Sequence, residues 1–507
     1  MNSKKRKAEE KDNADIIEST KENETADINA SNCGSGESGN STDHEKSDNG
    51  GASEQPGTSD EGEKDPKETN DDQSVDQAEN KHTRLDNSEA GGELLFCGGT
   101  NWDLIGRKEL PKYAKDAVGK NLWGPHRLKS LQGIKVTAVF AGSCAVHSVI
   151  LIEGGQAFTW GRNDKGQLGH CDNIRRDIPT RVETLKEHVI VSASCGRGHT
   201  LFVSERGICY ATGDNKCGQC GIGSQNTAIN IPTKISFKGR SISKVACGAE
   251  FSMIVDVKGG LYSFGSPEYG QLGHNSDGRY FVTSNKLSYK CELAPRRIVA
   301  FIEKNREGHV SLVDDVAITD VACGINHSVA IDTQKRCFSW GFGGYGRLGT
   351  NEPKDEYVPR LITALNGPKN AGSVKKIFAG GTYSLAINEY DVLYFFGQNR
   401  RTGEANMYPK PVQDLIGWRV RDVGCANNSI VCLADDSVIS WGPSPTYGEL
   451  GYGESRSRSS TTPQEVKPLE GVYIHSVDCG YGHTLLIAKN DTEEDRKKLN
   501  QFPEFTP

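Results

Sequence analysis

Short runs of aliphatic residues alternate with polar ones along most of the chain, from about residue 92 to residue 490. Glycine-rich turns separate these runs; Glu153-Gly154-Gly155 and Lys258-Gly259-Gly260 are two of them. Alternation with a period of two is typical of β-strands with one buried face, and strands joined by such turns form hairpins. The pattern therefore predicts an all-β domain made of many short strands.

The strand-like runs belong to a repeat. Its first half reads Cys-Gly-x-x-His-Ser/Thr, and seven clear or degenerate copies begin at Ser143, Cys195, Cys247, Cys323, Ala379, Cys425 and Cys479. Its second half is an aromatic residue and a glycine, followed by Gly-Gln-Leu-Gly, and it comes about 14–18 residues later. The best copies of this second half are Trp160–Gly169, Phe264–Gly273 and Trp340–Gly349.

The spacing of the repeat predicts the fold. Successive first halves lie 52, 52, 76, 56, 46 and 54 residues apart, and a period of about 50 with four strand-sized pieces is typical of a β-propeller blade. The last copy, Cys479–Ile487, has no second half, whereas Leu94–Gly98 and Asp103–Gly106 resemble a second half that has no first. We therefore predict a seven-bladed β-propeller over residues 92–490, closed by pairing of its N- and C-terminal strands, with residues 491–507 as a C-terminal tail.

Charge and composition set the start of the chain apart. The first 90 residues contain no Phe, Trp or Tyr and hold 11 Lys+Arg against 24 Asp+Glu, whereas the rest of the chain holds 49 against 43. Such a segment buries too little apolar surface to offset the entropy of ordering, so residues 1–91 are expected to be a disordered acidic tail. Its basic run, Lys4, Lys5, Arg6 and Lys7, is either a nuclear-import signal or a solvated charge cluster.

The repeat also accounts for residues that resemble catalytic or metal-binding groups. Four histidines share one repeat position: His147, His199, His327 and His483. Phe251 and Tyr383 stand at the same position in other copies, so we expect a buried hydrogen bond there rather than acid–base chemistry. Cys217-x-x-Cys220 is interpreted as an accident of the repeat, because Cys220 replaces the Leu of Gly-Gln-Leu-Gly. With no phosphate loop or nucleophile motif present, we expect no enzyme activity, no cofactor and no metal.

The two motifs, repeated seven times, resemble the regulator of chromosome condensation repeat family over about residues 92–490. Five stretches resemble the second branch of that family rather than its founding, chromatin-bound member: Thr100–Lys108, Asn121–His126, Gly265–Gly278, Trp340–Gly349 and Ser440–Gly453. The resemblance implies a regulator of small GTPases. The founding member is a guanine-nucleotide exchange factor for Ran, and the second branch is associated with Rac-, Arf- or Ral-type GTPases, mitosis and cell spreading.

The same resemblance implies where such a protein acts. Microtubules, centromeres and chromatin are the implied partners besides the GTPase, and the nucleus, nucleolus, cytoplasm and mitotic spindle are the implied locations. The net charge of the body gives only weak support for direct nucleic-acid binding. The apolar runs are too short for a bilayer-spanning helix, so we expect no insertion into membranes. We also expect the protein to be a monomer.

Two unlike parts of the repeat carry the candidate GTPase-binding residues. In the founding member, acidic residues between the Gly and the His of the first half contribute to exchange; at the matching positions here only Glu250 is acidic, which favours Rac-, Arf- or Ral-type GTPases over Ran. The insertion 275–315 explains the step of 76 residues. The resemblance implies a placement like that of the founding member's wedge hairpin, though in a neighbouring blade; the alternative is a hairpin packed on the rim. The candidates are Glu250, Tyr269, Asp277, Arg296 and Arg297. The alternative function is a scaffold without exchange activity that links microtubules or chromosomes to signalling partners.

Overall fold

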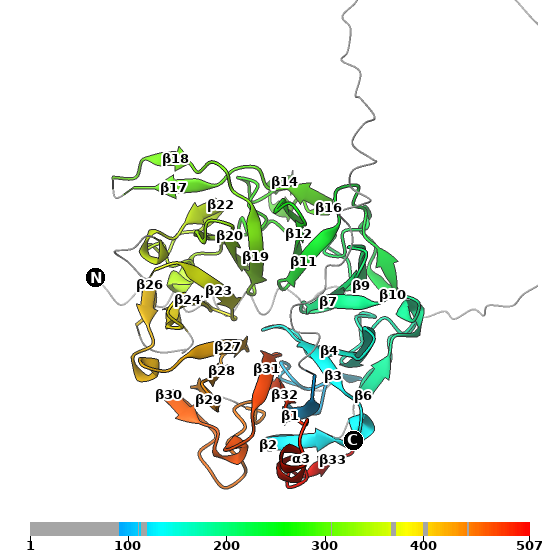
Figure 1. Ribbon diagram of the computed structural model, residues 1–507. Helices are drawn as coiled ribbons and strands as arrows, with labels where there is room; N and C mark the ends of the chain where they lie inside the picture. Colours follow the sequence, from blue (N-terminus) through cyan, green and yellow to red (C-terminus); the bar gives the residue numbers. More distant parts are fainter. Residues whose placement is uncertain are drawn as a thin grey trace, which may run out of the picture. The chain divides into compact units, whose positions relative to one another are not determined.

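The computed structural model describes residues 91–109, 111–112, 119–305, 307–366, 372–398, 404–443 and 446–507. The candidate import signal Lys4–Lys7 and the rest of residues 1–90 lie outside this part of the chain. Seven antiparallel blades stand around a common axis, as Figure 1 shows. The predicted seven-bladed propeller is therefore confirmed.

In blades 1, 2, 4, 5 and 6 the four strands of the blade are consecutive in the chain, and the innermost strand comes first. Blade 1 contains β3 (Val136–Phe140), β4 (His147–Ile152), β5 (Gln156–Gly161) and β6 (Arg176–Arg181). Blade 2 contains β7 (Ile190–Cys195), β8 (His199–Ser204), β9 (Cys209–Asp214) and β10 (Ala228–Lys234). Blade 4 contains β19 (Ile318–Cys323), β20 (His327–Asp332), β21 (Cys337–Gly341) and β22 (Glu356–Leu361). Blade 5 contains β23 (Val374–Ala379), β24 (Tyr383–Asn388), β25 (Leu393–Gly397) and β26 (Asn406–Pro411). Blade 6 contains β27 (Val420–Cys425), β28 (Ile430–Ala434), β29 (Ser437–Gly442) and β30 (Ser460–Glu465).

Blade 3 shows that the insertion was assigned too broadly. Its strands are β11 (Ile242–Cys247), β12 (Phe251–Asp256), β13 (Leu261–Gly265) and β16 (Glu292–Arg297). Residues 275–315 therefore do not leave the repeat as one block, because β16 is the ordinary outer strand of the blade. Two hairpins flank it: β14 (Arg279–Thr283) with β15 (Lys286–Tyr289), and β17 (Ile302–Lys304) with β18 (Val310–Leu312). The second hairpin extends the outer edge of blade 4, where β17 runs parallel to β22.

Blade 7 joins the two ends of the propeller. Its strands are β31 (Ile474–Cys479), β32 (His483–Ala488), β1 (Glu93–Gly99) and β2 (Asn121–Leu128). Strand β1 pairs antiparallel with β32, so that Leu94 lies opposite Ile487 and Gly98 opposite His483. The predicted closure of the ring by the N-terminal strand is thus confirmed.

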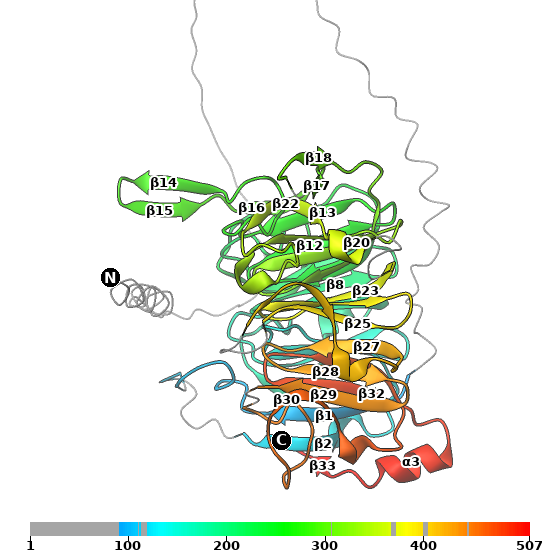
Figure 2. The same ribbon diagram turned by 90° about the vertical axis from the view of Figure 1, so that its left-hand side faces the viewer.

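The C-terminal residues are part of the same blade, which corrects the prediction of a separate tail over 491–507. Helix α3 (Glu493–Leu499) begins with a capping box between Thr492 and Asp495, and its last residue, Leu499, is buried in the core of blades 6 and 7. Strand β33 (Glu504–Phe505) then pairs parallel with β2. Figure 2 shows α3 and β33 beside β2 at the edge of the ring. Leu499 could have indicated this, since an apolar residue at the end of a capped helix is usually buried against another part of the protein.

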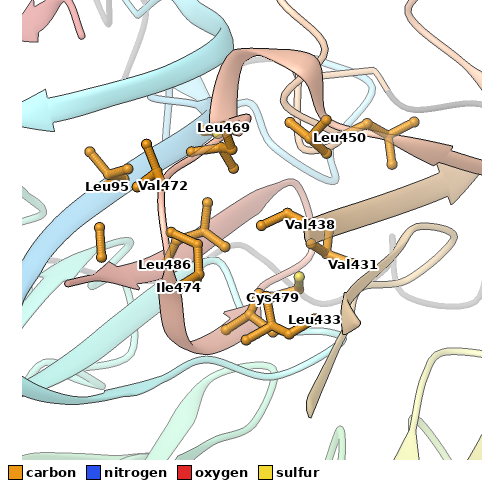
Figure 3. Close-up of a cluster of buried hydrophobic side chains, with 14 of the residues drawn as sticks. Leu95, Val431, Leu433, Val438, Leu450, Leu469, Val472, Ile474, Cys479 and Leu486 are labelled. Carbon is orange, nitrogen blue, oxygen red and sulfur yellow. The ribbon is translucent and has the colours of Figure 1, made fainter. Parts of the chain in front are cut away.

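Each blade packs on the next through an apolar layer. Figure 3 shows the layer between blades 6 and 7, where Val431 and Leu433 of β28 face Ile474 of β31 and Leu486 of β32. A single-turn 3-10 helix after most outer strands adds one buried leucine to these layers. These turns are Lys129–Leu131, Glu183–Leu185, Thr363–Leu365, Gln413–Leu415 and Lys467–Leu469. The 3-10 turn Gly344–Gly346 is of a different kind, since it follows the third strand of blade 4 and contains no leucine.

The repeated histidines link neighbouring blades. His147 bonds through Nε2 to the hydroxyl of Thr200 in blade 2 at 2.8 Å, and His483 of blade 7 bonds Ser148 of blade 1 at 2.6 Å. The Thr200 hydroxyl donates to the carbonyl of Gln167, so it can only accept from the imidazole. Nε2 therefore carries the proton, and burial lowers the pKa of His147 and His483 to about 3. His147 is therefore a neutral hydrogen-bond donor between blades 1 and 2.

Two further histidines and one tyrosine repeat this arrangement. His199 reaches Ser252 and His327 reaches Ser384, each at 2.9 Å. Tyr383 stands at the histidine position of blade 5, and its hydroxyl donates to carbonyls of blade 6. The glycine of each aromatic-Gly pair lies directly against this position. At Gly161, where φ is +110°, a Cβ would lie 2.6 Å from the Cα of His147, so only glycine fits.

The seven inner strands surround a narrow axial cavity of about 170 Å³. Small residues such as Ala246, Cys247 and Ala379 line most of it. Asp478 of β31 links blade 7 to blade 1: its carboxylate accepts a hydrogen bond from the backbone N–H of Ala141 at 2.8 Å. Burial raises the pKa of Asp478 to about 6.

Candidate partner-binding face

One face of the ring gathers the parts of the repeat that differ most between blades. It consists of the loops between the first and second strands and the turns that follow the third strands, and we call it the loop face. Backbone bonds join the two sets: Ser266 donates to the carbonyl of Glu250, and Phe342 donates to that of Asn326. Because the strands hold these loops rigidly, side chains on them have fixed positions relative to one another.

Glu250 lies on the loop face, between β11 and β12. Its carboxylate accepts from the Nη1 of Arg197 at 3.1 Å, across the boundary between blades 3 and 2. Arg197 occupies the equivalent loop of blade 2. Both side chains are about half exposed, so water screens this ion pair and a competing partner can break it at little cost.

Tyr269 belongs to an aromatic cluster on the same face. Its ring contacts that of Phe342 with centroids 5.0 Å apart. The guanidinium of Arg347 stacks on Phe342 at 4.6 Å and lies 5.8 Å from the ring of Tyr345. Arg347 is almost fully buried, and desolvation lowers its pKa to about 10. Tyr345 is exposed and has a positive φ of 61°, an uncommon backbone for an aromatic residue.

Arg347 replaces the glutamine that caps this turn in other blades. There the glutamine side chain accepts a backbone N–H two residues earlier, as Gln271 does from Tyr269 at 2.7 Å. An arginine has no acceptor. Arg347 instead donates to the carbonyls of Gly344 and Gly381.

Replacement of Arg347 should separate these contributions. We expect the free energy of unfolding of Arg347→Gln to lie within about 1 kcal/mol of that of the native chain, because the restored cap offsets the lost cation–π contacts. Arg347→Met has neither the glutamine cap nor the cation–π contacts, and we expect it to be less stable than Arg347→Gln by roughly 1–3 kcal/mol. Urea unfolding followed by fluorescence compares the two variants. Equal stability of both would show that the cap has no role.

The hairpin β14–β15 projects from the ring, as Figure 2 shows. Asp277 begins it, and its carboxylate accepts the backbone N–H of Arg279 at 3.0 Å. The hairpin exposes four large apolar side chains, Tyr280, Phe281, Val282 and Leu287. At its base, the side chain of Tyr289 lies beside that of Glu268, which directly precedes Tyr269 in the chain, and burial raises the pKa of both groups. The hairpin is therefore anchored to the aromatic cluster.

Arg296 and Arg297 do not lie with the other candidates. They are exposed on β16, opposite Ser263 and Tyr262 of β13, and so lie on the outer rim of blade 3. Arg296 forms an ion pair with Glu292 of the same strand at 2.6 Å. The structure thus brings Glu250, Tyr269 and Asp277 together at the hairpin side of the loop face and leaves the two arginines outside.

Residue-by-residue inspection of the sequence missed Arg197, Phe342, Tyr345 and Arg347. Arg347 had a usable signal, since it breaks the Gly-Gln-Leu-Gly motif with a charge. The described residues hold no group of three side chains that could bind a metal ion. None of the helices in the described ranges is long and apolar enough to cross a bilayer.

Comparison with known proteins agrees with this geometry. A family model described as the RCC1-like domain matches residues 93–486. Protein RCC2 homolog of Xenopus laevis is 53% identical over 426 residues, which are 84% of this chain and 83% of that protein. Protein RCC2 of Homo sapiens is 52% identical over 429 residues, with shares of 84% and 82%. The solved structure of Prp20p from Saccharomyces cerevisiae has a TM-score of 0.62 at 20% identity, covers 83% of this chain and 96% of its own, and is similar in fold. The chain belongs to the RCC1-like domain family, in the branch that contains the vertebrate RCC2 proteins.

Proposed function

We propose that this protein regulates a small GTPase by binding it at the hairpin side of the loop face. The exposed apolar hairpin β14–β15 carries the proposal. An isolated two-stranded hairpin is at best marginally stable in water, and a partner that covers Tyr280, Phe281 and Val282 would remove apolar area from solvent. Prp20p, which shares the fold, has been studied for its binding to Gsp1p and histones.

Nucleotide exchange by such a protein needs no bond-making residue. The regulator binds the nucleotide-free GTPase more tightly than the loaded form, and this difference in binding free energy drives nucleotide release. An apolar wedge and a nearby acidic group suit that task, since they occupy the space and the charge environment of the phosphates. Phe281 at the hairpin and Glu250 on the loop face are the groups that we assign to these two roles. Rac-, Arf- and Ral-type GTPases are the classes to test first, ahead of Ran.

A substitution at the hairpin tests the proposal. Phe281→Asp is expected to weaken binding of the nucleotide-free GTPase by at least about tenfold, which is about 1.4 kcal/mol, because an apolar anchor becomes a charge. Tyr390→Asp is the matched control, since Tyr390 is 71% exposed and Phe281 is 70% exposed, but Tyr390 lies on a turn of blade 5. The full chain is mixed with Rac, Arf, Ral and Ran: nucleotide release is measured on GTPases preloaded with a fluorescent guanine nucleotide, and binding is measured on the nucleotide-free GTPases. Equal binding by both variants would contradict the proposal.

One observation favours a second function, a scaffold that binds a GTPase without exchanging its nucleotide. Arg197 already compensates the charge of Glu250, and the other six loops between Gly and His carry no acid. Such a scaffold would link the GTPase to microtubules or centromeres. Binding lost in Phe281→Asp, with no faster nucleotide release by the native chain, would support the scaffold over the exchange factor.

A further inference from the structure

The base of the hairpin brings two cysteines of different blades together. Cys217 lies in the turn after β9 of blade 2, where its backbone N–H donates to the side chain of Gln219. Cys291 lies between β15 and β16 of blade 3. Both are half-buried, so neither is sealed in the core.

The backbones around the two cysteines are in direct contact. Gly223 donates its N–H to the carbonyl of Leu293 at 2.9 Å. Gly218 packs so closely that a Cβ there would lie 2.9 Å from the Cα of Leu293. The thiol groups of Cys217 and Cys291 lie beside each other across this contact and interact electrostatically. Cys217 also lies 3.9 Å from the carboxylate of Glu250.

The other thiols of the described residues differ from this pair. Cys220 is fully buried, and its Sγ points into blade 2 toward the carbonyl of Asp214 at 3.3 Å. It is therefore not the partner that Cys217-x-x-Cys220 suggests. Burial raises the pKa of the core thiols, among them Cys195 and Cys425, which makes them unreactive. The interaction between the two thiols instead lowers the pKa of Cys291 and raises that of Cys217, so Cys291 is the member of the pair that favours the reactive thiolate.

We propose that Cys217 and Cys291 form a reversible redox pair, which hydrogen peroxide closes into a disulfide between blade 2 and the base of the β14–β15 hairpin. The Cys291 thiolate attacks one peroxide oxygen; the O–O bond breaks, hydroxide leaves and a sulfenic acid forms. The Cys217 sulfur then attacks the sulfur of that sulfenic acid. The S–O bond breaks, an S–S bond forms, and the proton of Cys217 leaves with the hydroxide as water. The proton that Cys291 released on ionisation converts the hydroxide of the first step into water, so two thiols and one peroxide yield one disulfide and two waters.

The disulfide would act on the hairpin through its base. It fixes residue 291, two residues beyond the end of β15, to a rigid turn of blade 2, and so restricts the swing of the hairpin away from the loop face. Formation of the disulfide stands apart from the proposed GTPase binding. Only its effect on a partner rests on that function.

Peptide mapping of the full chain tests the pair. The native chain is treated with hydrogen peroxide, alkylated and digested without reductant. A cross-link between the peptides Cys217–Lys234 and Cys291–Arg296 is expected, with loss of two hydrogen atoms and with reversal by a dithiol. Fragmentation must place the bond at Cys217, and Cys220→Ala must retain it. Cys217→Ser and Cys291→Ser must each abolish it, whereas Cys171→Ser, which removes a fully separate exposed thiol, must not.

Hydrogen exchange provides a second readout that does not depend on any partner. Amides of Arg279–Tyr289 are expected to exchange more slowly after oxidation of the native chain, and at the unoxidised rate in Cys217→Ser. Oxidation of Cys291 to the sulfinic acid while Cys217 remains alkylatable would overturn the proposal. So would a cross-link that maps to Cys220. Failure of GTPase binding in every variant would leave these outcomes unchanged, and would count against the proposed function alone.

Discussion

Deletion of Glu93–Gly99 from the full chain is expected to unfold the whole propeller rather than one blade. These residues form β1, which pairs with β32 on one side and β2 on the other. Leu94, Leu95, Phe96 and Cys97 are all fully buried. Burial of each large apolar side chain contributes about 1.5–3 kcal/mol, and a domain is stable by only about 5–15 kcal/mol in total. Without β1 the ring also has an open edge on β32 and a detached β2.

Circular dichroism and urea unfolding measure this effect. The expected result is loss of the cooperative transition and elution as aggregate on size exclusion. Deletion of the seven residues Glu61–Lys67 is the length-matched control, which we expect to unfold like the native chain. A cooperative transition at the native urea concentration in the β1 deletion would refute the role given to ring closure.

The stability of the propeller is expected to fall steeply as the pH drops below about 6.5, because four buried histidines are neutral in the folded state. Burial lowers the pKa of His147, His199 and His483 to about 3, and that of His327 well below its usual value. An unfolded histidine titrates near 6.5. Between these two values unfolding takes up one proton per histidine, so the free energy of unfolding falls by about 1.4 kcal/mol per pH unit for each. For the three histidines with a pKa of about 3, both states are protonated below that pH and this loss ends.

A single substitution measures the contribution of one histidine to the pH dependence of the free energy of unfolding. His199→Gln keeps a donor for Ser252 and removes the titration, so the slope of the free energy of unfolding between about pH 6 and pH 4 should drop by about 1.4 kcal/mol per pH unit. The raised pKa of Asp478 has the opposite sign, since the folded state then binds the extra proton. It is common to both proteins and cancels in the comparison. His309→Gln, at a side chain that is 80% exposed, is the control. An unchanged slope in His199→Gln would show that the buried imidazole titrates normally.

The fold was predictable because each structural feature of a blade leaves the same sequence motif in several blades. Gly161 and Gly98 mark positions against a neighbouring backbone, and the unpaired halves at Leu94–Gly98 and Cys479–Ile487 specify how the ring closes. The sequence did not predict α3 and β33, which occur once and so give no repeated pattern. Arg296 and Arg297 were assigned to the insertion, whereas they lie on β16, the outer strand of blade 3. The reason is related: β16 follows an inserted hairpin, and its sequence has no motif that distinguishes an outer strand from a loop.

The candidate site was only partly predictable, because its residues are neighbours across blades rather than along the chain. Glu250 could be found from its repeat position, but its partner Arg197 depends on how two blades pack. The pairing of Cys217 with Cys291 is the clearest example. The sequence indicated that the spacing of Cys217 and Cys220 is an accident of the repeat, and the turn indeed points the Cys220 thiol into the core. Cys291 could not be found in the same way, because only the packing of blade 3 on blade 2 brings it close to Cys217.

The composite seventh blade also sets the order of events during synthesis. Strand β1 leaves the ribosome long before β32, its partner at His483–Ala488. At about 5–20 residues per second, roughly 20–80 seconds separate the two. During that time β1 and β2 present unpaired edges, which invite pairing with other chains. Nascent chains of this protein should therefore need a chaperone near their N-terminal strands until the last blade is made, and a translational pause before His483 should lower the yield of folded protein more than a pause after Ala488.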